Sequence, residues 1–129
     1  MADFSYKLDK HLITLSVILS GKKCRLMSRF VLDTGASFTI IDHSLAEILG
    51  YSARDGIGQS MVSSVLGKEQ GYRLIIESLE TLGNKCSKIE VRCHDLQEQG
   101  IEGLLGMNFL EQFDWCIHPK RQIISTHRL

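Results

Sequence analysis

The chain has 129 residues, the length of one ordinary domain and too short for two hydrophobic cores. Apolar residues make up 43% of it and charged residues 23%, a globular composition that argues against disorder. Fifteen basic and fifteen acidic residues cancel, so we expect neither nucleic acid nor an anionic membrane as the main partner, because both attract a basic surface. We therefore expect one soluble globular domain over residues 1–129.

No feature of the sequence predicts a membrane anchor, a cofactor or a metal site. Residues 1–7 lack the apolar core of a signal peptide, and the longest apolar stretch, 12–19, is too short to cross a bilayer. The four cysteines lack zinc-site spacing, so we expect reduced thiols in a cytoplasmic protein, with a Cys86–Cys93 disulfide as the alternative. The five histidines are scattered, and no two stand four residues apart as in a helical zinc protease site.

Two strands lead to the first candidate functional residue. Residues 11–19 alternate large apolar side chains with smaller or polar ones, which is typical of a strand. After a short turn, residues 24–32 return as a second strand that ends at Asp33. Gly35 breaks this strand, and residues 38–41 resume it.

A short helix and a series of hairpins fill the rest of the chain. Asp42 or Ser44 can cap a helix over residues 45–49, and Gly50 stops it. Beyond this helix most expected elements are short strands bounded by turn residues, the pattern of an all-β barrel or sandwich. They are strands at 59–65, 69–77, 78–82, 86–93 and 104–105, a helix at 107–113, and a last hairpin of 115–117 and 122–124, with Pro119 second in its turn.

The second strand ends in Asp-Thr-Gly followed by Ala-Ser. The apolar residues before Asp33 place its carboxyl at the edge of the core, where an unpaired carboxylate is costly. Gly35 permits a tight turn whose N–H can approach this carboxyl, and the Thr34 hydroxyl can bond to nearby backbone. The turn is suited to holding one carboxyl rigidly, although Asp-Thr-Gly also arises by chance as a plain turn.

A second motif lies about seventy residues further on. Residues 103–110 read Gly-Leu-Leu-Gly-Met-Asn-Phe-Leu, two apolar residues and a glycine followed by a short helix. Taken alone, this segment also fits an ordinary core strand, a glycine turn and an amphipathic helix. Its meaning comes from its combination with the Asp-Thr-Gly turn.

Together the two motifs resemble those of the retropepsin-like aspartic proteases, and the second is close to the form in bacterial single-domain members. The resemblance covers roughly residues 11–125. It implies an all-β fold, a closed retropepsin-like barrel with one or two short helices. It also implies an aspartic endopeptidase, a hydrolase that cleaves peptide bonds by general acid/base activation of water.

In that family two aspartates share one proton: one activates a water, and the other donates a proton to the peptide carbonyl oxygen. This chemistry needs two carboxyls about 3 Å apart. The chain has one Asp-Thr-Gly and no internal repeat, so a homodimer must bring two copies of Asp33 together across its two-fold axis. By resemblance Thr34 braces the dyad and Gly35 allows the close approach, so Asp33, Thr34 and Gly35 are the expected catalytic residues.

By the same resemblance, the hairpin around residues 64–68 is a flap that closes over an extended peptide or protein substrate, bound as an added strand. The expected substrate-binding residues are Ala36, Ser37, Ser64, Val65, Leu66 and Gly67. The expected structural support of the active-site turn comes from Leu104, Leu105 and Gly106.

Two other functions fit part of this pattern. The Asp-x-Gly phosphate turn of sugar kinases and actin-like ATPases needs two domains and a second phosphate loop, which 129 residues cannot supply. The stronger rival is a non-catalytic dimeric peptide-binding or interaction module with the same fold. The intact Asp33, Thr34 and Gly35 favour the protease.

The residue after the Asp-Thr-Gly turn bears on the working pH. Ala36 stands where many two-domain acid proteases carry Ser or Thr, so one hydroxyl that could stabilise an ionised carboxyl is missing. We predict a pH optimum less acidic than that of pepsin. A pH–rate profile of the purified dimer measures it, and a maximum at strongly acidic pH would contradict the prediction.

Overall fold

A computed structural model describes residues 2–64 and 67–127 as strands joined by turns, with two short α-helices. The strands are β1 (Ala2–Ser5), β2 (Lys7–Asp9), β3 (Leu12–Ser20), β4 (Arg25–Leu32), β5 (Thr39–Asp42), β6 (Gly58–Ser64), β7 (Gly67–Thr81), β8 (Asn84–His94), β9 (Gly103–Leu105), β10 (Trp115–His118) and β11 (Ile123–Thr126). The helices are α1 (His43–Ile48) and α2 (Met107–Leu110), with 3₁₀ turns η1 (Ala53–Asp55) and η2 (Gln97–Gln99).

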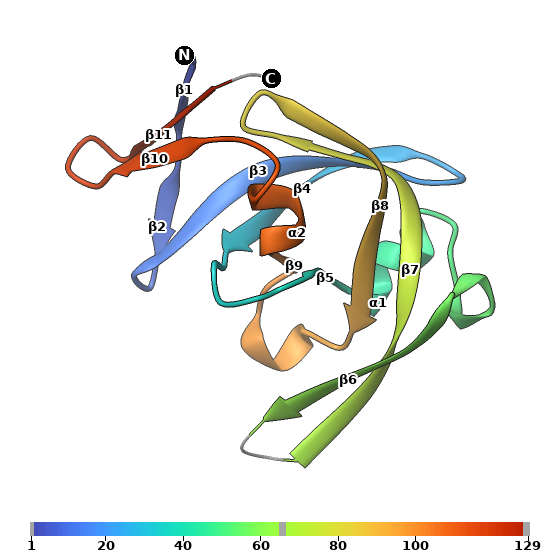
Figure 1. Ribbon diagram of the computed structural model, residues 1–129. Helices are drawn as coiled ribbons and strands as arrows, with labels where there is room; N and C mark the ends of the chain where they lie inside the picture. Colours follow the sequence, from blue (N-terminus) through green and yellow to red (C-terminus); the bar gives the residue numbers. More distant parts are fainter. Residues whose placement is uncertain (1, 65–66, 128–129) are drawn as a thin grey trace.

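The larger sheet closes into a barrel (Figure 1). Its strand order is β2-β3-β4-β9-β5-β8-β7-β6, and a further pairing of β3 with β7 joins the two sides. The strands β2 and β6 extend beyond this closure. The predicted all-β barrel with short helices is therefore confirmed.

The first hairpin follows from its side-chain pattern. Leu15, Val17 and Leu19 of β3 are fully or almost fully buried, while Ser16 between them is exposed. This alternation puts one face of β3 into the core, where Phe30 of β4 lies opposite Leu15 in the antiparallel ladder. The predicted strands at 11–19 and 24–32 are confirmed to within one residue at each end.

The helix α1 begins two residues before its predicted start. Asp42 is its N-cap, and its carboxylate accepts hydrogen bonds from the N–H and the hydroxyl of Ser44. Of the two predicted caps, Asp42 is thus correct, and Ser44 lies inside the helix. Gly50 follows the helix with a φ of +99°, a left-handed conformation that favours glycine, as predicted.

Three predicted boundaries are wrong. The segments 69–77 and 78–82 form the single strand β7, because neither Gly nor Pro separates them and the ladder with β8 runs through both. Helix α2 ends at Leu110 instead of 113, with Glu111 as its C-cap. Pro119 is the first residue of its turn, since its carbonyl accepts the Gln122 N–H.

All four cysteines are free thiols. Cys86 and Cys93 are seven residues apart on β8, which separates them by about 23 Å along an extended strand. A disulfide needs its two Cα atoms within roughly 7 Å, so this pair cannot be bridged. No helix in the described part of the chain is long and apolar enough to cross a membrane.

Both ends of the chain lie in a separate three-stranded sheet of order β1-β11-β10. The strand β1 pairs with β11 from Ala2 opposite Thr126 to Ser5 opposite Ile123. The Ser125 hydroxyl adds a hydrogen bond of 2.7 Å to the Asp3 carboxylate. Figure 1 shows β1 beside β11, so these first and last strands are paired within one chain.

Candidate active site

The active-site turn begins where β4 ends. The Asp33 N–H donates to the Leu105 carbonyl at 3.0 Å, which continues the pairing of β4 with β9 by one residue. The Gly35 N–H donates to Asp33 Oδ1 at 2.9 Å, and the Ala36 N–H donates to the Asp33 carbonyl at 3.2 Å. A Cβ on Gly35 would lie 3.2 Å from Oδ1, so glycine lets the backbone hold this carboxyl closely. The Asp33 carboxyl is therefore held by a hydrogen bond within its own chain.

The Asp33 side chain is only partly buried, and Thr34 and Gly35 are exposed. The apolar residues before it do reach the core, as predicted, with Phe30 fully buried and Val31 6% exposed. The turn therefore presents its carboxyl and the Thr34 side chain at the surface of the chain. Ala36 is partly buried beside them, and Ser37 is exposed.

The strand β9 lies between the two halves of the interrupted strand. It pairs in parallel with β4, with Leu104 opposite Val31 and Leu105 opposite Leu32. It pairs antiparallel with β5, with Leu104 opposite Ile40. Leu105 is fully buried. The structure thus brings the two sequence motifs together, with the Leu104–Gly106 segment against the turn that it was predicted to support.

Asn108 ties the turn to α2. Its Oδ1 accepts from both the N–H and the hydroxyl of Thr39, each at 2.9 Å, and its Nδ2 donates to the Glu90 carbonyl at 2.7 Å. The Thr39 hydroxyl also accepts the Gly106 N–H at 3.1 Å. The first N–H groups of α2, those of Met107 and Asn108, donate to the carbonyls of Ala36 and Ser37. Every residue from 36 to 39 except Phe38 is thereby bonded to the start of α2 or to its preceding glycine.

Sequence analysis did not identify this role of Asn108. Its only signal is a short amide side chain at the second position of a helix, directly after the Leu-Leu-Gly motif. Its partners Thr39 and Glu90 are 69 and 18 residues away. Asn108 meets these partners because β9 lies between β4 and β5. The local sequence pattern does not predict that placement of β9.

The expected flap is the hairpin of β6 and β7, which Figure 1 shows extending away from the body of the molecule. Its ladder runs from Gly58 opposite Arg73 to Ser64 opposite Gly67. Of the four predicted flap residues, Ser64 and Gly67 form the last described pair of the hairpin. Val65 and Leu66 lie outside the described residues.

A histidine at the base of this hairpin is a further residue that sequence analysis missed. His94 is 2% exposed, and its Nε2 lies 2.9 Å from the Ser60 hydroxyl on β6. Its Nδ1 is buried with no hydrogen-bond partner among the described residues. A Cβ on Gly71 of β7 would lie 2.7 Å from the His94 ring, so only glycine fits here. His94 therefore joins the end of β8 to the hairpin in a tightly packed site.

Burial lowers the pKa of His94 from its ordinary value, because a charged ring loses hydration. The negative charge of Glu69 acts in the opposite direction, and electrostatic interactions with His43 and Arg92 lower the pKa further. Next to His94, burial raises the pKa of the Cys93 thiol to about 12, so this thiol stays protonated and unreactive. At physiological pH the His94 ring and the Cys93 thiol are therefore both uncharged.

Residues 17–112, which contain both motifs, match the protein family described as "gag-polyprotein putative aspartyl protease". Among curated protein sequences, none matches the chain. The structure is similar to a retropepsin-like aspartic protease from Rickettsia conorii, with a TM-score of 0.74 and 18% identity over 96% of this chain and 98% of that one. It is also similar to the protease of EIAV in complex with the inhibitor HBY-793, with a TM-score of 0.63 and 19% identity over 84% of this chain and 92% of that one. The structural likeness establishes the retropepsin-like fold.

The Asn108 network generates a stability prediction. Asn108→Ala leaves the buried Thr39 N–H and the Glu90 carbonyl without their partner, which we expect to lower the free energy of unfolding by about 3 kcal/mol. Gln112→Ala, two residues beyond the end of α2, is the control, with an expected change within about 0.5 kcal/mol, because its side chain is exposed. Urea unfolding at one protein concentration measures both. If both variants lower the free energy of unfolding by the same small amount, the Asn108 network does not stabilise the turn.

His94 generates a pH prediction. Its pKa is lower in the folded chain than the unfolded value of about 6.5, so the unfolded chain binds the proton more readily as pH falls below that value. The contribution to stability is therefore complete above about pH 6.5 and is lost on acidification. In His94→Gln, which cannot titrate, we expect a shallower fall in the free energy of unfolding between about pH 7 and 5. Exposed His127→Gln is the control, and parallel curves for wild type and His94→Gln would refute the assignment.

Proposed function

The chain belongs to the family of gag-polyprotein aspartyl proteases and is an aspartic endopeptidase with a retropepsin-like fold, and we propose that its active site is a dyad of two Asp33 carboxyls in a homodimer. One observation carries this proposal. The chain has a single Asp-Thr-Gly turn, whose carboxyl lies at the surface, held by the Gly35 N–H. Aspartic catalysis requires two carboxyls that share a proton, so a second copy must supply the other.

In the proposed mechanism, the ionised member of the dyad removes a proton from a water that attacks the peptide carbonyl. The protonated member donates a proton to the carbonyl oxygen. The exposed Thr34 braces the dyad across the two-fold axis, and Gly35 lets the two turns approach. These roles agree with the fixed carboxyl and with the exposure of residues 34 and 35.

The proposed substrate is an extended peptide or protein segment that binds between the turn and the hairpin as an added strand. Ala36 and Ser37 form the floor beside Asp33. Ser64, Val65, Leu66 and Gly67 contact the substrate from the flap. Leu104, Leu105 and Gly106 support the turn through β9, which supplies no reacting group.

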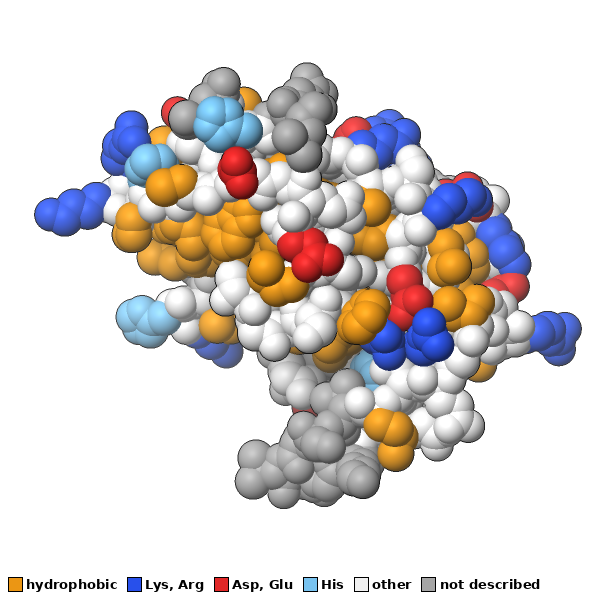
Figure 2. Space-filling model, in the orientation of Figure 1, with side chains coloured by type: hydrophobic (Ala, Val, Ile, Leu, Met, Phe, Trp, Pro, Cys, Tyr) orange, Lys and Arg blue, Asp and Glu red, His pale blue; other side chains and the backbone are white. Residues whose placement is uncertain are grey.

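The surface of the proposed dimer is constrained by the terminal sheet. Within one chain β1 and β10 both pair with β11, so β1 and β10 are the two edge strands of this sheet. In Figure 2 apolar side chains gather on one face below β10. Partly exposed apolar residues of β10 and β3 include Trp115, Ile117 and Leu12. We place the dimer contact on this face together with the Asp33 turn.

We propose that residues 1–129 act as one unit in the cytoplasm. The four free cysteines support this location, because thiols persist in a reducing compartment. The balance of fifteen basic and fifteen acidic residues supports peptide substrates rather than nucleic acid.

Substitution of the proposed dyad tests the proposal. Asp33→Asn should lower kcat/KM for peptide cleavage by about 10²–10⁴-fold, because the acid/base group is lost while the shape is kept. Asp9→Asn, an exposed change of the same kind, should leave kcat/KM unchanged. Peptide-library cleavage followed by mass spectrometry measures both. Self-association without cleavage of any peptide by the wild type would favour the non-catalytic module instead.

Mixing the two proteins tests the shared site directly. When equal amounts of wild type and Asp33→Asn exchange subunits, activity per wild-type chain should fall to about half, because mixed dimers have one functional carboxyl. Specific activity of the wild type should also rise with protein concentration until the dimer is saturated. Sedimentation over the same concentrations is the matching measurement, and concentration-independent activity of a monomer would overturn the dimeric site.

A further inference from the structure

A charged platform lies at the end of the active-site segment. Phe38, five residues after Asp33, is 37% exposed. The guanidinium carbon of Arg92 on β8 lies 3.8 Å from the centroid of its ring, which is a cation–π contact. A Cβ on Gly106 would lie 2.5 Å from the Phe38 carbonyl carbon, so the backbone under the ring is closely packed. The ring and the guanidinium are therefore held in a fixed place.

Arg92 belongs to a network with one more positive than negative charge. Its terminal nitrogen lies 3.0 Å from the Glu90 carboxylate, and Glu90 also accepts two hydrogen bonds of 3.0 Å from Arg73. The hydrogen bonds and charge of Arg73 hold the pKa of Glu90 below its usual range against the effect of burial, so this carboxylate is ionised. Two arginines thus share one carboxylate, and one positive charge is left over.

The placement of the two arginines beside each other lowers the stability of the fold. Arg73 and Arg92 stand directly opposite each other in the β7–β8 ladder, where like charges repel. Arg92 is 20% exposed, and its Nε is buried with no hydrogen-bond partner among the described residues. The part of this guanidinium that reaches the surface, rather than the buried Nε, is suited to binding an anion.

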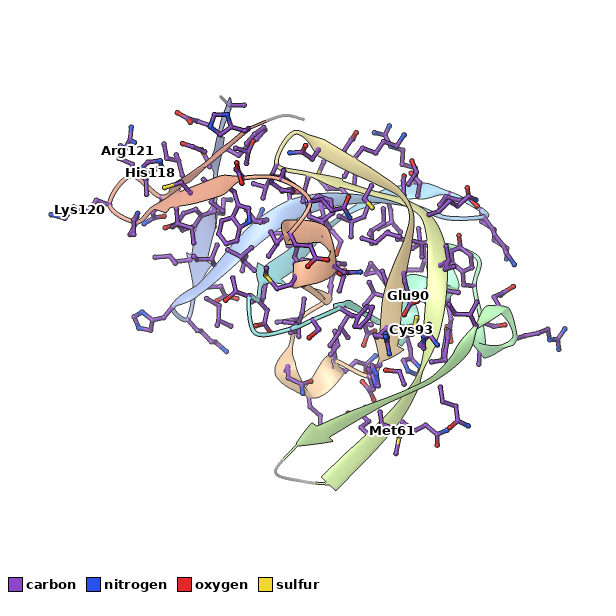
Figure 3. The ribbon with its side chains drawn as sticks, in the orientation of Figure 1. Met61, Glu90, Cys93, His118, Lys120 and Arg121 are labelled. Carbon is purple, nitrogen blue, oxygen red and sulfur yellow. The ribbon has the colours of Figure 1, made fainter. Side chains whose placement is uncertain are left out.

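The sheet places this platform along the path of the proposed substrate. Arg92 lies opposite Ile40 of β5, two residues after Phe38, and on its other side opposite Arg73. Arg73 in turn lies opposite Gly58, where the hairpin of β6 and β7 begins. Figure 3 shows Glu90 on β8 above the hairpin that carries Met61. Phe38 and Arg92 therefore lie in the part of the sheet between the Asp33 turn and this hairpin.

We propose that Arg92, held over the Phe38 ring, is a specificity-determining residue that selects a substrate with an acidic side chain, Asp or Glu, within a few residues of the scissile bond. This inference rests on the proposed function of the Asp33 turn. The guanidinium offers a planar set of donors that matches a carboxylate, and the aromatic ring keeps that plane oriented. Glu90 cancels the charge of one arginine only, so an incoming carboxylate completes the pairing.

Matched peptides test this preference. Decapeptides that differ only by Asp or Asn at one position, scanned across four residues on each side of the cleaved bond, are compared by kcat/KM. We expect one position at which the wild type prefers Asp about tenfold, and loss of that preference in Arg92→Gln. Phe38→Leu keeps the positive charge of Arg92 and removes the aromatic ring. Its preference for the Asp peptide should therefore fall less than that of Arg92→Gln.

Arg121→Gln is the control variant, since it removes the same charge from the exposed β10–β11 turn, which Figure 3 shows far from Glu90. It should keep the full preference. Thermal unfolding verifies that each variant is folded, and Arg92→Lys, which keeps the charge, should retain part of the preference. A wild type without a preference, or an unchanged preference in Arg92→Gln, overturns the inference.

A binding measurement separates this inference from the proposed function. The Asp33→Asn protein is titrated with the same fluorescein-labelled Asp and Asn decapeptides, and anisotropy reports binding without cleavage. Tighter binding of the Asp peptide, lost on adding Arg92→Gln, supports the inference even if the wild type cleaves nothing. If the wild type cleaves peptides but neither assay shows a preference for Asp, the inference is refuted and the proposed protease function still stands.

Discussion

The insertion of β9 between β4 and β5 is the constraint on which the active-site turn depends. The chain leaves the sheet after Leu32, turns through Asp33 and Gly35, and re-enters at Thr39. The gap is filled by a three-residue strand from the far end of the sequence, which pairs in parallel on one side and antiparallel on the other. The turn is thus fixed at both ends by the same strand, and its carboxyl gains a defined position without being buried.

This arrangement separates two tasks that a single chain cannot combine. Positioning of Asp33 is complete within one protomer, through the Leu105 carbonyl and the Gly35 N–H. Polarisation of a water and a carbonyl needs a second carboxyl, which Asp33 of a single chain does not have beside it. A two-fold dimer of this kind requires a rigid turn at the surface of each chain. Movement of the turn would displace both carboxyls of the dyad, one in each chain.

The sequence could predict what depends on neighbours along the chain. Alternation located β3, the possible caps Asp42 and Ser44 located the start of α1 to within two residues, and two short motifs identified the fold. It could not predict contacts that depend on strand order. Asn108 meets Thr39 across 69 residues, and His94 meets Ser60 across 34, and neither pair has a local pattern. The error in β7 has the same cause, because pairing with β8 and not local composition decides its length.

Three features outside the dyad restrict the pH at which the site can work. Ala36 supplies no hydroxyl to stabilise an ionised carboxyl, so strong acid is not needed to protonate one member of the dyad. His94 anchors the hairpin as a neutral ring, and protonation would place an uncompensated charge in a buried site. Arg92 can select an acidic side chain only while that side chain is ionised, above about pH 4. Each feature acts through a different element of the fold, and in the proposed dimer the three together favour proteolysis at a pH nearer neutrality.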